Sequence, residues 1–117
     1  MSYVIKVAIR NAQHPEYGQA TIPFPIPDGE YDRTIERLEE LDIGHSLGQD
    51  CLITGLDSSY AVLSRLEGSA VNVDELDYLA KRLDSFVDSE AAQFQGMAAK
   101  LDIAGIQDFI NLTFCCQ

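Results

Sequence analysis

The chain has 117 residues, of which 46% are hydrophobic, and its 19 Asp and Glu against 8 Lys and Arg give a formal net charge of −11. That length suits one compact domain or two very small ones, and the composition excludes a disordered or collagen-like chain. The sequence has no apolar run of about 18 residues, as a membrane span needs, and residues 1–6 lack the basic-then-apolar plan of a signal peptide. We therefore expect a cytoplasmic protein whose charge repels nucleic acids and membrane surfaces.

Two strands are expected at the start of the chain. Residues 3–10 read Tyr-Val-Ile-Lys-Val-Ala-Ile-Arg and are dominated by Val and Ile, which favours a strand. Apolar residues alternate at every second position through 17–26, which predicts a second strand. Pro23, Pro25 and Pro27 lack amide protons, so they confine the end of that strand to a sheet edge or end it.

An acidic helix is predicted next, near residues 30–42, and a third short strand at 51–56. The apolar stripe of the helix has a spacing of three to four residues and consists of Ile35, Leu38 and Leu41, with Tyr31 one turn before them. Residues 1–58 are therefore predicted to form a small α/β domain, a β-sheet with one helix on it.

The second half is predicted to be helical. The Ser58-Ser59 pair can cap a short helix at 60–67, and Asn72 followed by Glu75 matches a capping box for a helix that ends near 85. Two further helices are expected, one from residue 88 and one after residue 105. The side chains expected to face inward are Tyr60, Leu63, Leu66, Leu76, Leu79, Ala80, Leu83, Phe94, Met97, Ala98, Leu101, Ile106, Phe109, Ile110 and Phe114.

Short loops between these helices suggest a bundle, so residues 59–117 are predicted to form a small helical bundle domain. The expected fold class of the whole chain is α+β, a small N-terminal β-sheet with one helix followed by that bundle. The chain ends on a largely apolar stretch, Asn-Leu-Thr-Phe-Cys-Cys-Gln, and we expect it to be a fragment of something longer.

No catalytic constellation stands out. The sequence contains neither a Gly-x-Ser-x-Gly elbow nor a glycine-rich phosphate loop. His14 and His45 fall in predicted turns and are expected to be solvated. Cys51, Cys115 and Cys116 provide neither a disulfide framework nor the ligand spacing of a zinc site. We therefore expect no enzymatic activity, no cofactor and no metal.

The acids, in contrast, are concentrated in two segments. Seven fall within residues 28–42 against two arginines, and six fall within 74–90 against one lysine and one arginine. Neighbouring like charges on a helix are mildly destabilising, so a dense set calls for a reason. One reason is mimicry of the phosphate backbone of DNA, and the alternative is a solvated helix face kept acidic for solubility.

Several stretches resemble the ArdA antirestriction family in their local sequence and in their order along the chain. They are the opening strand at residues 4–9 followed by Tyr17-Gly18, then Phe24-Pro25-Ile26 leading into the acidic helix, then Ile53-Thr54-Gly55-Leu56-Asp57, and then Val73-Asp74-Glu75-Leu76-Asp77-Tyr78-Leu79-Ala80. The longer clostridial-type members are the most similar, especially through 72–86 and 108–117, and the resemblance covers nearly the whole chain.

This resemblance implies a DNA mimic that inhibits type I restriction-modification enzymes and is carried on plasmids and conjugative transposons. Members of the family have three small domains in an elongated, curved, acidic shape and are usually dimeric. The chain is similar to the first two domains, whereas the dimer contact of the family lies largely in the third. The implied partner is therefore the restriction-modification enzyme itself, with no direct contact to nucleic acid or membrane.

In this interpretation, surface carboxylates stand in for phosphates and meet Lys and Arg on the enzyme. The acids expected to do so are Glu36, Glu39, Glu40, Asp42, Asp74, Asp77, Asp84, Asp88 and Glu90. The alternative is a non-enzymatic protein-interaction or regulatory module of a mobile genetic element that uses the apolar stretch at residues 109–116. Salt distinguishes the two, because screening weakens an ionic contact far more than an apolar one.

Overall fold

The computed structural model of the chain describes residues 3–43 and 48–115 and shows a single antiparallel sheet with helices packed on it. The sheet order is β2-β1-β3-β4, where the strands are β1 (Ile5–Asn11), β2 (Gln19–Phe24), β3 (Cys51–Ser58) and β4 (Ala70–Val71). The predicted α+β class is thereby confirmed. Strand β2 lies at the edge of the sheet, as its prolines required, because Pro23 has no amide proton to donate to a further strand.

Strand β1 pairs with β2 on one side and with β3 on the other, and every second side chain enters the core. Ile5, Val7 and Ile9 are fully buried, whereas Lys6 is exposed on the opposite face of the sheet. The register toward β3 shifts between Ala8 and Ile9, which marks a β-bulge. One face of the sheet is therefore apolar and covered, and the other is open to solvent.

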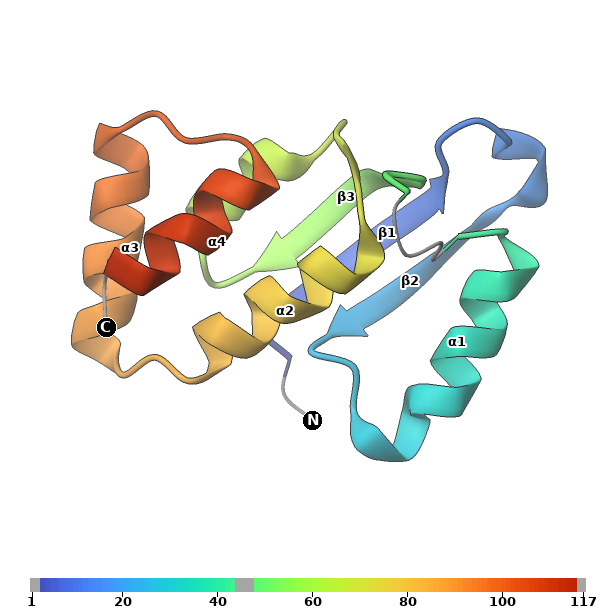
Figure 1. Cartoon of the computed structure of the whole chain (residues 1–117), viewed down its shortest axis with the longest axis horizontal. Coiled ribbons are helices and arrows are strands. Elements are labelled where there is room, and N and C mark those ends of the chain that lie inside the picture. Colours follow the sequence, from blue (N-terminus) through green and yellow to red (C-terminus); the bar gives the residue numbers. More distant parts are fainter. Residues whose placement is uncertain (1–2, 44–47, 116–117) are drawn as a thin grey trace.

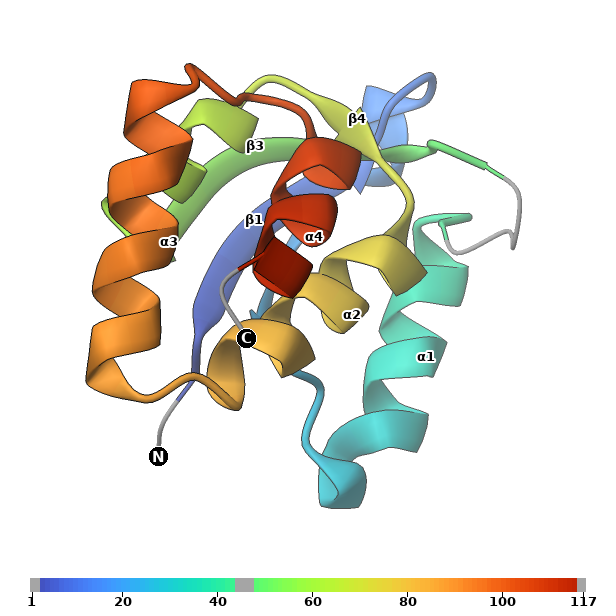
Figure 2. The same ribbon diagram turned by 60° about the vertical axis from the view of Figure 1, so that its left-hand side comes forward.

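The helices of the protein lie on that apolar face (Figures 1 and 2). They are α1 (Tyr31–Glu40), α2 (Val73–Asp84), α3 (Asp88–Lys100) and α4 (Ile106–Cys115), with 3₁₀ turns η1 (Pro15–Tyr17), η2 (Asp28–Glu30) and η3 (Ala61–Leu66) between elements. Helix α2 contacts both β2 and α4, and α3 packs against α4 and η3. The helical second half therefore rests directly on the sheet of the first half.

The buried side chains of both halves belong to one cluster, from Ile5 in β1 to Leu112 in α4. The second half also contributes β4, which the sequence analysis missed because a two-residue strand has no periodicity of its own. Residues of β4 pair with Cys51 and Leu52 of β3. The domain boundary expected after residue 58 stays a prediction.

Local signals placed the start of α2 correctly. The Asn72 side-chain oxygen accepts hydrogen bonds from the amides of Asp74 (2.9 Å) and Glu75 (3.2 Å), as an N-cap should. Ser58 was expected to cap the short helix but is the last residue of β3. Its hydroxyl donates a hydrogen bond to the carbonyl oxygen of Val4 at 2.6 Å and accepts one from the amide of Tyr60 at 3.1 Å. That short helix is the 3₁₀ segment η3.

Three side chains expected to face inward are exposed. Leu101 (59% exposed) follows α3 just before the chain turns through Asp102 at φ 56°, so it lies beyond the last packed turn. Phe114 (55% exposed) lies in the last turn of α4 and packs its ring on the guanidinium of Arg82, 4.1 Å from the ring centroid. Tyr31 is 50% exposed at the start of α1.

Candidate partner-binding surface

Helix α1 carries three of the predicted contact acids, and the side chains of Glu36, Glu39 and Glu40 are all exposed. They face outward because Leu38, on the opposite side of the helix, is buried in the core. Glu40 Oε2 lies 3.4 Å from Arg37 Nη1 in a solvent-exposed pair, a contact that contributes only about 0–1 kcal/mol. Glu36 and Glu39 have no hydrogen-bond or ion-pair partner within the described part of the chain, so they are available to a binding protein.

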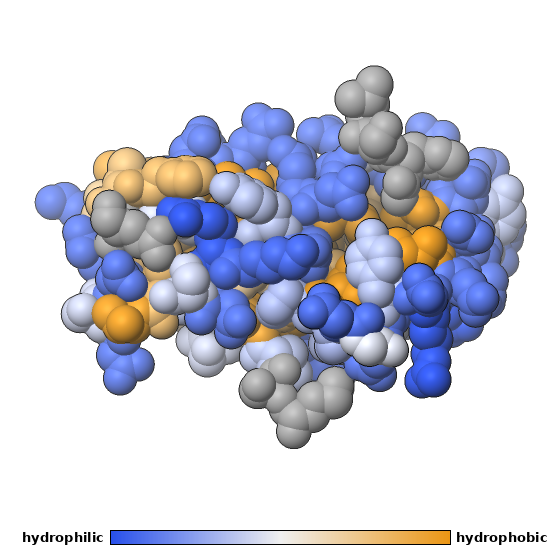
Figure 3. Space-filling model, turned by 60° about the horizontal axis from the view of Figure 1, so that its bottom comes forward, coloured by the Kyte–Doolittle hydropathy of each residue, from blue (hydrophilic) through white to orange (hydrophobic). Residues whose placement is uncertain are grey.

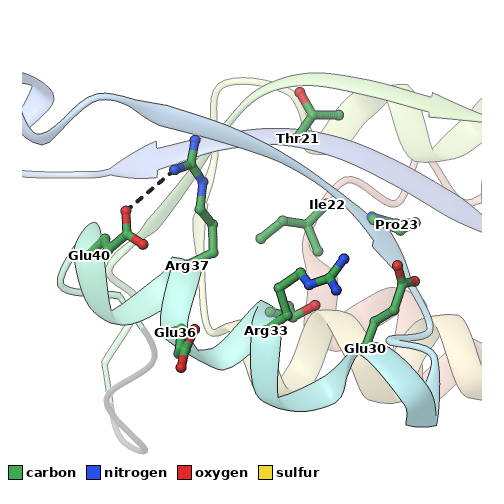
Figure 4. Close-up of a pocket in the computed structure, with 9 residues that line it drawn as sticks. Thr21, Ile22, Pro23, Glu30, Arg33, Glu36, Arg37 and Glu40 are labelled. Carbon is green, nitrogen blue, oxygen red and sulfur yellow. Dashed lines mark hydrogen bonds and ion pairs between the residues drawn. The ribbon is translucent and has the colours of Figure 1, made fainter.

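A groove of about 290 Å³ separates α1 from the edge strand β2. Arg33 and Arg37 extend from α1 into this groove toward β2 (Figure 4). Its lining includes these two arginines and Glu30, Glu36 and Glu40, for a net lining charge of 2 − 3 = −1. The sequence analysis missed the groove, although arginines four residues apart already indicated a shared side of the helix. The mixed charge gives it no preference for an anion or a cation.

Asp42 is positioned by a buried side chain of the sheet. It follows α1 in the left-handed region at φ 55°. The side-chain amide of Asn11, a residue only 4% exposed, donates to the carbonyl oxygens of Leu41 (3.0 Å) and Asp42 (3.1 Å). These bonds satisfy carbonyl groups at the end of the helix. The carboxylate of Asp42 is exposed, beside the other acids of α1.

Asp74 lies in the first turn of α2, where its negative charge interacts favourably with the helix dipole. Its side chain is exposed, and the structure gives its carboxylate no partner among the described residues. Asp74 therefore fits the predicted role of a surface carboxylate.

The carboxylate of Asp77 is used inside the fold and joins two elements that are distant in the sequence. The side chain is only 15% exposed. One oxygen accepts the amide of Ile26 at 2.9 Å, and the other lies 2.9 Å from Lys81 Nζ. This bond joins α2 to the segment between β2 and α1. The structure thus assigns Asp77 a structural role, which the sequence analysis missed because its partner amide is 51 residues away.

Asp77→Ala is expected to destabilise the fold by about 1–3 kcal/mol, because it leaves the Ile26 amide without its acceptor. Urea unfolding followed by circular dichroism measures this change. Asp77→Asn is the matched control, since its side-chain oxygen can still accept from that amide and only the exposed pairing with Lys81 is lost. Equal destabilisation by both variants would contradict the role assigned to the Ile26 bond.

The remaining predicted acids lie where α2 passes into α3. Asp84 is the last residue of α2, and Asp88 is the first of α3. Burial raises the pKa of the nearby Tyr60 hydroxyl, and the charges of Asp84 and Asp88 raise that pKa further, so both carboxylates lie near the same phenol. Glu90 is partly used by the fold, because its Oε1 accepts the amide of Val87 at 3.0 Å at the start of α3. Asp84 and Asp88 are exposed and without a partner among the described residues.

Most of the predicted acids fall into two separated groups, one on α1 and one at the α2–α3 connection, and Asp74 and Asp77 lie in the first half of α2. The group on α1 and the group at the α2–α3 connection lie toward opposite ends of the molecule (Figure 1), whose extents are 40 × 30 × 23 Å. Duplex DNA carries one charge per about 1.7 Å of axis, or roughly 24 charges over such a length. A net charge of −11 is less than half of that. Phosphate mimicry by this chain must therefore be local.

The candidate nucleophiles and metal ligands of the described residues do not form a site. Burial, with a smaller contribution from the charge of Asp50, raises the pKa of the Cys51 thiol to about 12, which makes it a poor nucleophile. His14 Nδ1 lies 2.9 Å from Glu16 Oε2, and its ring stacks on Tyr17. Residues 3–43 and 48–115 contain no group of three His, Cys, Asp or Glu side chains suited to a metal ion. His45 and Cys116 lie outside the described residues.

No protein-family model, no curated protein and no solved structure matches this chain. Among its described helices, none combines the length and the apolar character that crossing a membrane requires. The function must therefore be argued from the charge and geometry of the surface described above.

Proposed function

We propose that the chain is a DNA mimic that binds the DNA-binding groove of a type I restriction-modification enzyme and inhibits the enzyme without any covalent chemistry. The observation that carries the proposal is a set of exposed carboxylates that the fold leaves unpaired. These are Glu36, Glu39, Asp74, Asp84 and Asp88. The resemblance to the ArdA family supplies the choice of target.

Unpaired surface carboxylates suit this function because they remain free to bind another protein. A groove that holds DNA presents Lys and Arg toward phosphates, and carboxylates accept charge-assisted hydrogen bonds from the same side chains. The net charge of −11 also steers the chain toward such a groove and raises the rate of association. Because the role is spread over two groups of acids, no single substitution is expected to abolish it.

The alternative is an interaction module that uses the apolar end of the chain. The structure reduces the surface available for it, because Phe109 and Leu112 are buried in the core. Phe114 is exposed, but one face of its ring is covered by Arg82. Ionic and apolar binding still predict opposite responses to salt.

A competition experiment tests the proposal. Purified type I methyltransferase is bound to a labelled duplex carrying its recognition site, and the chain is titrated in at 50 mM and at 300 mM salt. We expect displacement of the duplex, and a Kd of the chain for the enzyme, calculated with the duplex affinity measured at the same salt, that weakens by about tenfold or more at the higher salt, because several ion pairs form together. Displacement that is insensitive to salt would support the interaction module instead, and no displacement would overturn the proposal.

A further inference from the structure

Two exposed tyrosines lie on the neighbouring helices α1 and α2 and mark what is called the α1–α2 surface below. Tyr31 (50% exposed) begins α1, and Tyr78 (45% exposed) lies in the middle of α2. The two helices are neighbours in Figures 1 and 2, and the hydrogen bond between Asp77 and the Ile26 amide holds α2 against the segment that leads into α1.

Lys81 shows how close the two helices come at this point. It follows Tyr78 by one turn of α2 and pairs with Asp77 at 2.9 Å. The hydrogen bond with Asp77 and the charge of that carboxylate raise the pKa of the Lys81 ammonium, and Asp28 and Tyr31, at the start of α1, add smaller electrostatic effects in the same direction. The start of α1 therefore lies within electrostatic reach of the exposed side of α2.

The α1–α2 surface combines apolar and acidic side chains. Ile35, one turn after Tyr31 on α1, is half-buried and packs on the core from this side. Asp28 and Asp74 are exposed nearby, the latter one turn before Tyr78. Figure 3, which views the molecule from below, shows hydrophobic surface among hydrophilic side chains where α1 and α2 lie next to each other.

We propose that this α1–α2 surface is the centre of a docking surface for a Lys/Arg-rich protein surface, with Tyr31 and Tyr78 as its non-ionic contact residues. The inference rests on the proposed function and adds to it the contact that charge alone does not supply. A tyrosine ring accepts a cation over its face, and its hydroxyl accepts a hydrogen bond, so both groups suit arginine. Tyrosines of this kind often contribute most of the energy of an interface.

Charge selects this occupant over the others. A nucleic acid would be repelled by a chain of net charge −11, and a second copy carries the same charge. A basic protein surface is attracted at long range by the acids and is then held at short range by the tyrosines. Because the tyrosine contacts are not ionic, their contribution does not fall with salt as the contribution of the acids does.

The test compares Tyr31→Ala/Tyr78→Ala with Tyr17→Ala, a matched control whose side chain is equally exposed (45%) but lies in η1, on the connection between β1 and β2. Two probes are used, each at low and at high salt: the methyltransferase competition described above, and direct binding of a labelled eight-residue oligoarginine peptide followed by fluorescence anisotropy. The double variant is expected to lose about tenfold in affinity, and the loss should be similar at both salt concentrations. Tyr17→Ala is expected to lose less than twofold. A Tyr31→Phe/Tyr78→Phe variant keeps the rings and should retain most of the binding.

The two probes separate the inference from the proposed function. Wild-type binding to both probes with no loss in the double alanine variant would overturn the inference and leave the function standing. Oligoarginine binding that depends on the tyrosines, without displacement from the methyltransferase, would overturn the function but support a docking surface for basic partners. No binding of either probe by the wild-type chain would overturn both.

Discussion

Phe94→Ala is expected to lower the free energy of unfolding by about 3–5 kcal/mol, the usual cost of emptying a fully buried aromatic site. Phe94 is 0% exposed, and its ring meets those of Tyr60, Phe86 and Phe109 with centroids 5.9–6.1 Å apart. It therefore joins η3, the α2–α3 connection, α3 and α4. Since small domains are stable by about 5–15 kcal/mol, this loss removes a large share of the total.

Thermal and urea unfolding followed by circular dichroism measure the effect. Phe114→Ala is the control, because it removes the same ring from an exposed position of α4 and is expected to cost about 1 kcal/mol. The shape of the transition also tests the boundary predicted after residue 58. One cluster of buried residues predicts one cooperative transition, whereas two steps, with the sheet outlasting the helices in Phe94→Ala, would support two separate domains.

Neutralising the acids at both ends of the surface is expected to produce the largest loss of binding. The variant carries Glu36→Gln, Glu39→Gln, Asp84→Asn and Asp88→Asn, and its net charge is −11 + 4 = −7. It should displace DNA from the methyltransferase at least about tenfold less well at low salt, and its affinity should depend less on salt, because fewer ion pairs form. The fold should be unaffected, since the structure gives these four carboxylates no partner among the described residues.

The control for this variant removes the same number of charges elsewhere. It carries Glu16→Gln, Glu67→Gln, Asp102→Asn and Asp108→Asn, and its net charge is also −7. Three of these acids already have partners in the fold: Glu16 with His14, Glu67 with the Leu56 amide, and Asp102 with Arg65. Equal weakening by both variants would mean that total charge, and not the placement of the acids, determines binding. Complete loss with Glu39→Gln alone, in a folded protein, would contradict a distributed surface.

Salt also distinguishes the acids from the tyrosines of the α1–α2 surface. Loss of the four acids should matter most at low salt, where screening is weak, whereas loss of Tyr31 and Tyr78 should matter about equally at low and high salt. Opposite behaviour of the two sets would mean that the α1–α2 surface contributes to binding through its charges alone.

Sequence signals determined the elements of this protein wherever the signal is local. The Val and Ile content of β1, the alternation and prolines of β2 and the Asn72 N-cap each act over a few residues, so they predicted two strands, a sheet edge and the start of a helix. The exposure of Glu36 and Glu39 followed in the same way, since the apolar stripe of α1 decides which side of the helix faces the core.

Only the tertiary structure decided which of those acids form contacts within the fold and which helices lie next to each other. Asp77 and Asp74 share a helix and a charge, but Asp77 alone accepts the Ile26 amide, a partner set by the packing of α2 on the sheet. Strand β4 is too short to show a period, and it forms because β3 offers an edge to pair with. The α1–α2 surface combines Tyr31 and Tyr78, residues that are 47 positions apart in the printed sequence. Contacts over such separations depend on how the elements pack against each other. The residue pattern of a single stretch of sequence does not indicate that packing.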